Sequence, residues 1–229
     1  MTLQDFLDAY DATRAQSISE RFDAYTAHLI ETNEKFNLTA ITDPAEISVL
    51  HYLDSAQGAR LLPRGAKVCD VGAGAGFPSV PLALLRDDCT FTLVDSLNKR
   101  VGFLQEIFRR LDLPHCRAVH SRAEDFARTH RSAFDVVVAR AVAPLPTLLE
   151  YCAPLTAQGG LVVAYKGNRA DEEAEDAQRA ATQLGLLAID AIEYTLPIGG
   201  TRKILVYRRD GDCPTRYPRG GNKPRTNPL

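Results

Sequence analysis

The chain has no apolar run long enough to cross a membrane. A membrane-spanning helix needs about 20 consecutive apolar residues, and no stretch of this 229-residue sequence approaches that length. The first residues, from Met1 to Asp5, are polar and acidic and lack the basic and apolar regions of a secretory signal. We therefore expect a cytoplasmic protein with no membrane partner, and we predict a monomer.

The sequence also lacks closely spaced pairs of cysteines. The five cysteines are odd in number and scattered, and no two are spaced as Cys-x-x-Cys. This pattern is typical of reduced cytosolic thiols in a core and not of a disulfide framework or a zinc site. The sequence therefore predicts no metal centre.

The net charge of −2 excludes a strongly basic coat for nucleic acid, but the charge is unevenly distributed. Acidic residues predominate over residues 1–63, whereas residues 208–225 carry six basic residues against Asp210 and Asp212. A basic tail can follow a phosphate backbone. It can equally be a solvated terminus, which is the interpretation that charge alone favours.

Helical patterns occupy the first 60 residues. Ser17 followed by Glu20 predicts a capping box, and Asp43 followed by Pro44 predicts a second helix start. The segment is too small to bury a core of its own. We therefore expect residues 1–63 to form an N-terminal helical extension packed on the following domain.

Strand and helix patterns alternate from Ala66 onward, which indicates an α/β domain over residues 64–210 with a largely parallel sheet. Strands are expected at Lys67–Val71, Thr90–Asp95, Cys116–His120, Phe134–Ala139, Leu161–Lys166, Ala188–Thr195 and Lys203–Arg208. Helices are expected at Ser79–Arg86, Lys99–Leu111, Ala123–Thr129, Leu145–Tyr151 and Ala170–Leu184. Gly159-Gly160 predicts a turn, and the loop before the last strand is too short for a crossover, so the last strand should be antiparallel.

A glycine loop joins the first of these strands to its helix. Its sequence, Asp70 to Pro78, has the spacing G-x-G-x-G and not the G-x-G-x-x-G of pyrophosphate-binding folds. Glycines let the backbone approach a ligand where a Cβ would collide. An acid followed by this spacing resembles the first motif of class I S-adenosylmethionine (SAM) methyltransferases, whose sheet is Rossmann-like. The alternative is a tight turn in another α/β protein.

Each strand end is a candidate for ligand contact, because ligands in open α/β sheets bind beyond the carboxyl ends of the strands. Asp70 ends the first strand; the alternative to a ligand contact is that it caps the amides of the glycine loop. Asp95 ends the second strand, where a carboxylate can accept hydrogen bonds from both ribose hydroxyls of a ligand. The alternative is that Asp95 is a helix N-cap. Glu124 follows the third, where it would lie by the adenine or complete a capping box with Ser121.

Two further cations stand at strand ends. Arg140 follows the buried fourth strand, so it needs a carboxylate or the substrate as its partner, and Lys166 ends the fifth. No Asp/Asn-Pro-Pro-aromatic loop for an exocyclic amine follows the fourth strand, and no Pro-Cys nucleophile is present. A methyl-acceptor atom that already has an available lone pair would need neither the loop nor the nucleophile.

Several longer motifs resemble the GidB/RsmG family over nearly the whole chain. They are Asp70–Ala83, Leu93–Leu104, Arg122–Glu124, Ala139–Val142, Lys166-Gly167, Asn37–Thr39, His51–Ser55, Gly200–Lys203 and Asn227–Leu229. The resemblance implies methylation of guanine N7 in bacterial 16S, small-subunit, rRNA. Ser79 stands where the family usually has another glycine, and the tail around Arg219 lacks the expected second arginine.

The resemblance also implies roles for particular residues. SAM, the expected cofactor, would be bound by Gly72, Gly74, Gly76, Phe77, Asp95, Ser96, Ala123, Glu124 and Arg140. RNA contacts are expected from Asn37, Thr39, His51, Lys166, Arg202, Lys203 and Arg219. Arg140 and Lys166 are the candidates for the catalytic, positioning role. Apart from the resemblance, the Pro/Gly/Arg-rich composition of the basic tail over residues 211–229 leaves open whether the tail is ordered before it binds RNA.

Three hypotheses remain open on the sequence. The first is an rRNA guanine-N7 methyltransferase. The second is a methyltransferase of a small molecule or a protein, with a merely solvated tail, and the third is a SAM-binding module without catalysis. Transfer of label from SAM to ribosomal RNA, to protein or to neither separates them.

Overall fold

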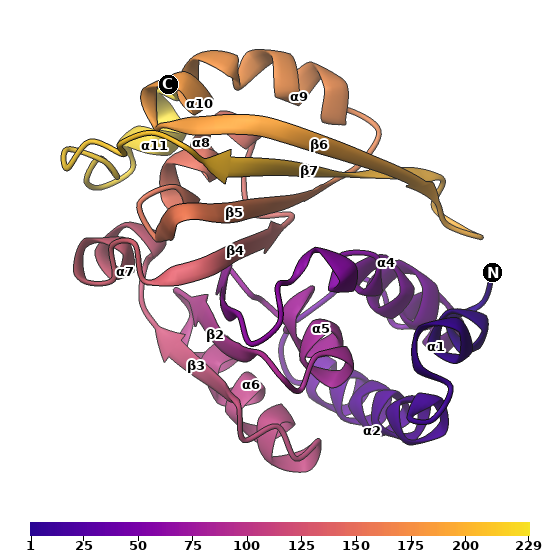
Figure 1. Cartoon of the computed structure of the whole chain (residues 1–229). Helices are drawn as coiled ribbons and strands as arrows, with labels where there is room; N and C mark the ends of the chain where they lie inside the picture. Colours follow the sequence, from indigo (N-terminus) through magenta and orange to yellow (C-terminus); the bar gives the residue numbers. More distant parts are fainter.

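A seven-stranded mixed sheet carries helices on both faces in the computed structural model, which describes residues 1–229 (Figure 1). The strands are β1 (Lys67–Val71), β2 (Thr90–Asp95), β3 (Cys116–His120), β4 (Phe134–Arg140), β5 (Thr156–Lys166), β6 (Leu186–Thr195) and β7 (Thr201–Arg209). Their order is β3-β2-β1-β4-β5-β7-β6. Strands β1 to β5 are parallel, and β7 lies antiparallel between β5 and β6. The predicted fold and its closing antiparallel hairpin are confirmed.

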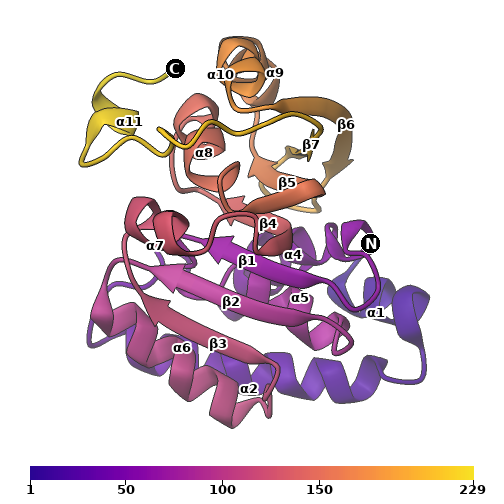
Figure 2. The ribbon, with the colours of Figure 1, turned by 60° about the vertical axis from the view of Figure 1, so that its left-hand side comes forward.

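Helices form a layer on each face of the sheet (Figures 1 and 2). The first layer contains α1 (Leu3–Asp11), α2 (Ala15–Asn33), α3 (Pro44–Ile47), the π-helical η1 (Ser48–Leu53), α4 (Asp54–Ala56), the 3-10 turn η2 (Ala59–Leu61), α5 (Ser79–Leu85) and α6 (Asn98–Arg110). The second contains α7 (Ala123–Thr129), α8 (Leu145–Cys152), α9 (Ala170–Asp176), α10 (Gln178–Gln183) and α11 (Lys223–Thr226). No helix combines the length and the apolarity that crossing a membrane requires.

Two local predictions about helices are wrong. Ser17 does not cap a helix, because α2 begins earlier, at Ala15, where Ala15 and Ile18 are buried against the core. The predicted helix over residues 170–184 is interrupted at Ala177, which separates α9 from α10. The helix start at Asp43 is confirmed, since its carboxylate accepts a hydrogen bond from the Glu46 amide at 3.0 Å.

The expected turn at Gly159-Gly160 lies within β5, at an irregularity of its pairing with β4. The pairing of β4 with β5 shifts register between Phe134 and Val136, next to these glycines. A Cβ on Gly160 would lie 2.7 Å from the carbonyl oxygen of Asp135, so only glycine allows this approach of the two backbones.

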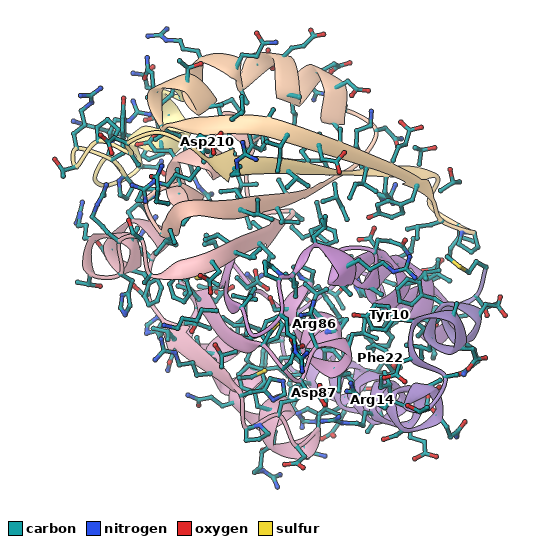
Figure 3. All side chains as sticks on the ribbon, in the orientation of Figure 1. Tyr10, Arg14, Phe22, Arg86, Asp87 and Asp210 are labelled. Atoms are coloured by element: carbon teal, nitrogen blue, oxygen red, sulfur yellow. The ribbon has the colours of Figure 1, made fainter.

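The N-terminal helices share one hydrophobic core with α5, α6 and the sheet. Phe22 and Leu29 of α2 belong to the same buried cluster as Val80 and Leu104. Polar contacts add to this packing, because Arg14 donates to the carbonyl of Leu84 at 3.0 Å and pairs with Asp87, two residues after the end of α5. Figure 3 labels Arg14, Phe22 and Asp87 in this region, between the first helices and α5.

The segment after β7 is folded against the second helical layer, a point that its composition left open. Cys213 and Tyr217 are buried, and Arg131 donates hydrogen bonds to the backbone carbonyls of both. Arg219 pairs with the fully buried Glu150 of α8 at 2.6 Å. The segment therefore gains enough buried contacts to be ordered by the protein itself.

Candidate functional site

The strand order reverses between β1 and β4, and two cavities open beyond the carboxyl ends of the strands around this point. In Figure 2, β1 and β2 point toward the same edge of the sheet. Ala141 and Val142, directly after β4, line both cavities. Ala141 has φ 56°, a left-handed conformation that alanine seldom adopts, and it turns the chain across this edge.

The glycine loop passes beneath Val142. Gly72 has φ 74°, and a Cβ there would lie 2.8 Å from a methyl carbon of Val142. Gly76 has φ 99°, and a Cβ there would lie 2.6 Å from Val80. These two positions require glycine both for their backbone conformation and for the close packing.

Asp70 is fully enclosed below this loop and does not cap its amides. Neither carboxylate oxygen has a hydrogen-bond partner, and the hydroxyl of Ser79 is unpartnered as well. Burial raises the pKa of Asp70 to about 7, while the nearby hydroxyl and amide of Ser79 lower it in part. Capping of the glycine-loop amides, the alternative role that the sequence left open for Asp70, is therefore not observed.

The smaller cavity, of about 170 Å³, lies at the ends of β1, β2 and β3. Asp95 projects into it and is only 3% exposed. Its two oxygens accept hydrogen bonds at 2.9 Å from the amides of Gly74 and Leu97, and Arg100 lies 3.5 Å away. Each oxygen keeps a lone pair, so Asp95 caps the adjoining turns and can still accept hydrogen bonds from a ligand.

Glu124 supplies a second buried acid to the smaller cavity. No side chain caps the start of α7, and the hydroxyl of Ser121 donates instead to the carbonyl of Arg122. The capping box of Ser121 with Glu124 is therefore absent. Arg122 lies 3.8 Å from the Glu124 carboxylate, which leaves that carboxylate directed at the cavity.

The larger cavity, of about 1150 Å³, lies beyond β4 and β5 and carries four cations. These are Arg140, Lys166, Arg169 and Arg202. Carboxylates pair with three of them: Asp54 with Arg140, Glu173 with Lys166 and Glu172 with Arg169. Arg202 donates only to the backbone carbonyls of Gly199 and Thr201, so it is the cation of this cavity with no acidic partner.

Arg140 links the N-terminal helices to the sheet edge. Its guanidinium donates to Asp54 at 2.7 Å, to the carbonyl of Leu50 at 2.9 Å and to Nδ1 of His51 at 2.9 Å. It also lies 5.1 Å from the ring centre of Phe77. The expectation that Arg140 needs a carboxylate partner is confirmed, and the π-helical turn η1 supplies two of these acceptors.

His51 is a buried, neutral member of this cluster. Its ring stacks on Phe77 at 4.2 Å, and its Nε2 hydrogen-bonds the hydroxyl of Thr39 at 2.9 Å. Burial, and then the charge of Arg140, lower its pKa to about 3. Both ring nitrogens are thus engaged within the protein.

The structure brings together most of the predicted site residues, but in two groups. Gly72, Asp95, Ser96, Ala123 and Glu124 line the smaller cavity, whereas His51, Arg140, Lys166 and Arg202 line the larger one. The other predicted residues line neither: Gly74, Gly76, Phe77, Asn37, Thr39, Lys203 and Arg219.

Four of these seven have a different partner in the fold. Phe77 is buried beneath His51 and Arg140. Lys203 pairs with Asp171 at 2.7 Å and Glu193 at 3.2 Å, so its charge is already compensated. Arg219 is held by Glu150, and Thr39 by His51. Lys203 and Arg219 therefore each have a carboxylate partner within the protein, and their contacts with RNA stay a prediction.

Sequence reasoning missed several lining residues. Asp54 was present in the motif His51–Ser55, but it lies on the short helix α4, and no local pattern indicated that it would pair with Arg140, 86 positions later. Tyr151 and Arg225 of the smaller cavity carried no signal in the sequence, because the folding of the last segment brings Arg225 to α8.

Comparisons with known proteins agree with this geometry. The family model "GidB: rRNA small subunit methyltransferase G" matches residues 18–194. A curated relative from Lactobacillus delbrueckii, named ribosomal RNA small subunit methyltransferase G, is 42% identical and the match covers 97% of this chain and 96% of the relative. A relative of the same name from Halalkalibacterium halodurans is 43% identical over 94% and 92% of the two chains.

Solved structures share the fold at low sequence identity. M. jannaschii TYW2 in complex with AdoMet aligns with a TM-score of 0.55 at 15% identity, covering 68% of this chain and 73% of that one. TrmN from Thermus thermophilus aligns with a TM-score of 0.53 at 19% identity, covering 69% and 48%. Together with the motifs and the two cavities, the matches establish that this chain belongs to the GidB family of small-subunit rRNA methyltransferases.

Proposed function

We propose that this protein methylates N7 of a guanine in small-subunit rRNA. As a member of its family it is a SAM-dependent rRNA methyltransferase; the proposal adds the acceptor atom and the residues. One observation carries it: a small cavity with buried acids and a large cavity with cations meet at Ala141 and Val142. A methyl group delivered at this boundary would face whatever the larger cavity holds.

The smaller cavity suits the adenosyl part of SAM. Asp95 has free lone pairs for the two ribose hydroxyls, and Ala123 and Glu124 lie beside it for the adenine. A volume of about 170 Å³ is below the range usual for a whole ligand, so the remainder of SAM would extend past Gly72 toward the larger cavity. When bound, SAM supplies a methyl group that its sulfonium makes electrophilic.

The residues of the larger cavity suit an acceptor that carries no proton. The N7 lone pair of guanine lies in the ring plane, so no general base is required. His51, the histidine of this cavity, has both nitrogens in hydrogen bonds and a pKa of about 3. The protein's contribution is then alignment, which can supply about 7–11 kcal/mol of the barrier.

The cations of the larger cavity would hold RNA around the guanine. Arg202 lacks an acidic partner and is assigned to a phosphate or to guanine O6. Arg140 and Lys166 are held by Asp54 and Glu173, which fixes their positions beside the boundary. The guanine must be unpaired or extruded to enter, and a cation over its ring would oppose the positive charge that it gains.

The remaining sequence-based assignments form part of the proposal. Residues 1–63 are the helical extension, residues 64–210 the SAM-binding domain and residues 211–229 the basic C-terminal segment. The protein is proposed to act as a monomer in the cytoplasm, where its rRNA substrate is made.

Methyl transfer from labelled SAM to isolated small ribosomal subunits tests the function. Digestion of the rRNA to nucleosides should place the label in 7-methylguanosine. Label in ribosomal protein or in a small molecule would overturn the proposal in favour of a different acceptor. Binding of SAM without any transfer would favour a non-catalytic module.

A further inference from the structure

The last segment of the chain is fixed on both sides of Arg225. One residue before it, the carbonyl of Pro224 accepts a hydrogen bond from the buried hydroxyl of Thr147 at 2.7 Å. Two residues after it, the carbonyl of Asn227 accepts a hydrogen bond from Arg219 at 2.8 Å. The backbone on both sides of Arg225 is thus held by the fold. Figures 1 and 2 show α11, which contains Arg225, next to α8.

A further contact, between Arg219 and Glu150, holds the segment in place. Arg219 is bound by Glu150 through contacts of 2.9, 3.1 and 2.6 Å, and the Glu150 side chain has no exposed surface. A buried carboxylate held in this way by a guanidinium fork resists displacement. Glu150 and the next residue, Tyr151, lie on α8, so the same helix that anchors the segment also lines the smaller cavity.

Arg225 reaches the smaller cavity beside Tyr151. Burial raises the pKa of the Tyr151 phenol, and the positive charge of the nearby Arg225 lowers it in part. Asp95, Ala123 and Glu124 line the same cavity. Arg225 does not line the larger cavity.

We propose that Arg225 is a cofactor-binding residue that contacts the adenosyl part of SAM, so that the C-terminal segment forms one wall of the cofactor pocket. This inference rests on the proposed function. A guanidinium suits the task, because its five N–H donors match the ring nitrogens of adenine and its plane can stack on the base. Of the basic residues in the segment, Arg225 is the one that lines this cavity.

Calorimetry with S-adenosylhomocysteine tests the proposal without turnover. Arg225→Ala should weaken binding by roughly 10- to 100-fold, as expected for a lost hydrogen bond to a charged group. Lys223→Ala is the matched control, since Lys223 is an exposed cation of the same helix and lines neither cavity. It should bind as the wild type does. Arg225→Lys should recover only part of the loss, because an ammonium lacks the planar fork.

A second ligand locates the contact. Methylthioadenosine contains the adenosyl part and lacks the amino acid part, so Arg225→Ala should weaken it by the same factor. Loss of S-adenosylhomocysteine binding alone would overturn the adenosyl assignment. Unchanged binding of both ligands, with weaker rRNA binding, would make Arg225 an RNA contact and overturn the inference. Failure of the wild type to bind either ligand would instead overturn the proposed function.

Discussion

Nη1 of Arg140 and Oδ2 of Asp54 lie 2.7 Å apart at the wall of the larger cavity, although 86 residues separate them in sequence. The other oxygen of Asp54 accepts a hydrogen bond from the Tyr194 hydroxyl at 2.8 Å. One carboxylate thus joins the N-terminal helices, the end of β4 and strand β6. The positioning of Arg140 therefore depends on residues outside the Rossmann-like core.

A double-mutant cycle measures this dependence. Arg140→Ala should destabilise the protein by about 3–5 kcal/mol, because it leaves Asp54 as an unpaired buried charge. Adding Asp54→Ala should recover part of the loss, with a coupling of roughly 1–3 kcal/mol in urea unfolding. The exposed pair Arg169–Glu172 is the control, with a coupling of about 0–1 kcal/mol. Equal coupling energies for the two pairs would contradict the conclusion that Arg140 depends on Asp54 for its position.

Asp95→Ala should weaken S-adenosylhomocysteine binding by more than about tenfold, because the variant loses a charged acceptor for the ribose hydroxyls. Calorimetry gives the affinity, and a melting curve records the loss of the two amide contacts that Asp95 also accepts. Asp125→Ala, an exposed acid of α7 that lines neither cavity, is the comparison. Wild-type affinity in a folded Asp95→Ala protein would remove Asp95 from the cofactor site.

Arg219→Ala should act on stability and not on RNA affinity. The sequence led us to expect weaker RNA binding with a smaller salt slope, but the guanidinium is engaged by the buried Glu150. Its removal leaves an uncompensated buried charge, so a loss of about 3–5 kcal/mol is expected. Adding Glu150→Gln should restore part of it. A variant of normal stability whose RNA binding has a reduced dependence on salt would restore the original interpretation.

Asp70 should make stability depend on pH. Its pKa in the folded protein, about 7, exceeds the unfolded value of 3.8, so the folded state holds the proton more tightly. Its favourable contribution is present below the unfolded pKa and is lost as the pH rises toward 7. Asp70→Asn should therefore raise the melting temperature more at pH 8 than at pH 4.5. An equal shift at both pH values would show that Asp70 does not titrate in this range.

The sequence by itself determined the sheet, because its information is local. Apolar runs ending in Asp70, Asp95 and Arg140 specify strands, and a continuous apolar β4 specifies burial on both faces. Parallel strands end at one edge of the sheet, so the same runs indicated that Gly72, Asp95, Glu124 and Arg140 lie near one another. The glycine spacing and the longer motifs then identified the cofactor and the family.

Only the tertiary structure decided which charges are free. Lys203, Arg219 and Arg202 look alike as basic residues near the end of the chain, but carboxylates from β6, α8 and α9 compensate the first two and leave Arg202 without an acidic partner. It also decided that His51 is buried and neutral and that Arg225 reaches the smaller cavity. An ion pair forms between residues far apart in sequence, so no local pattern can specify it.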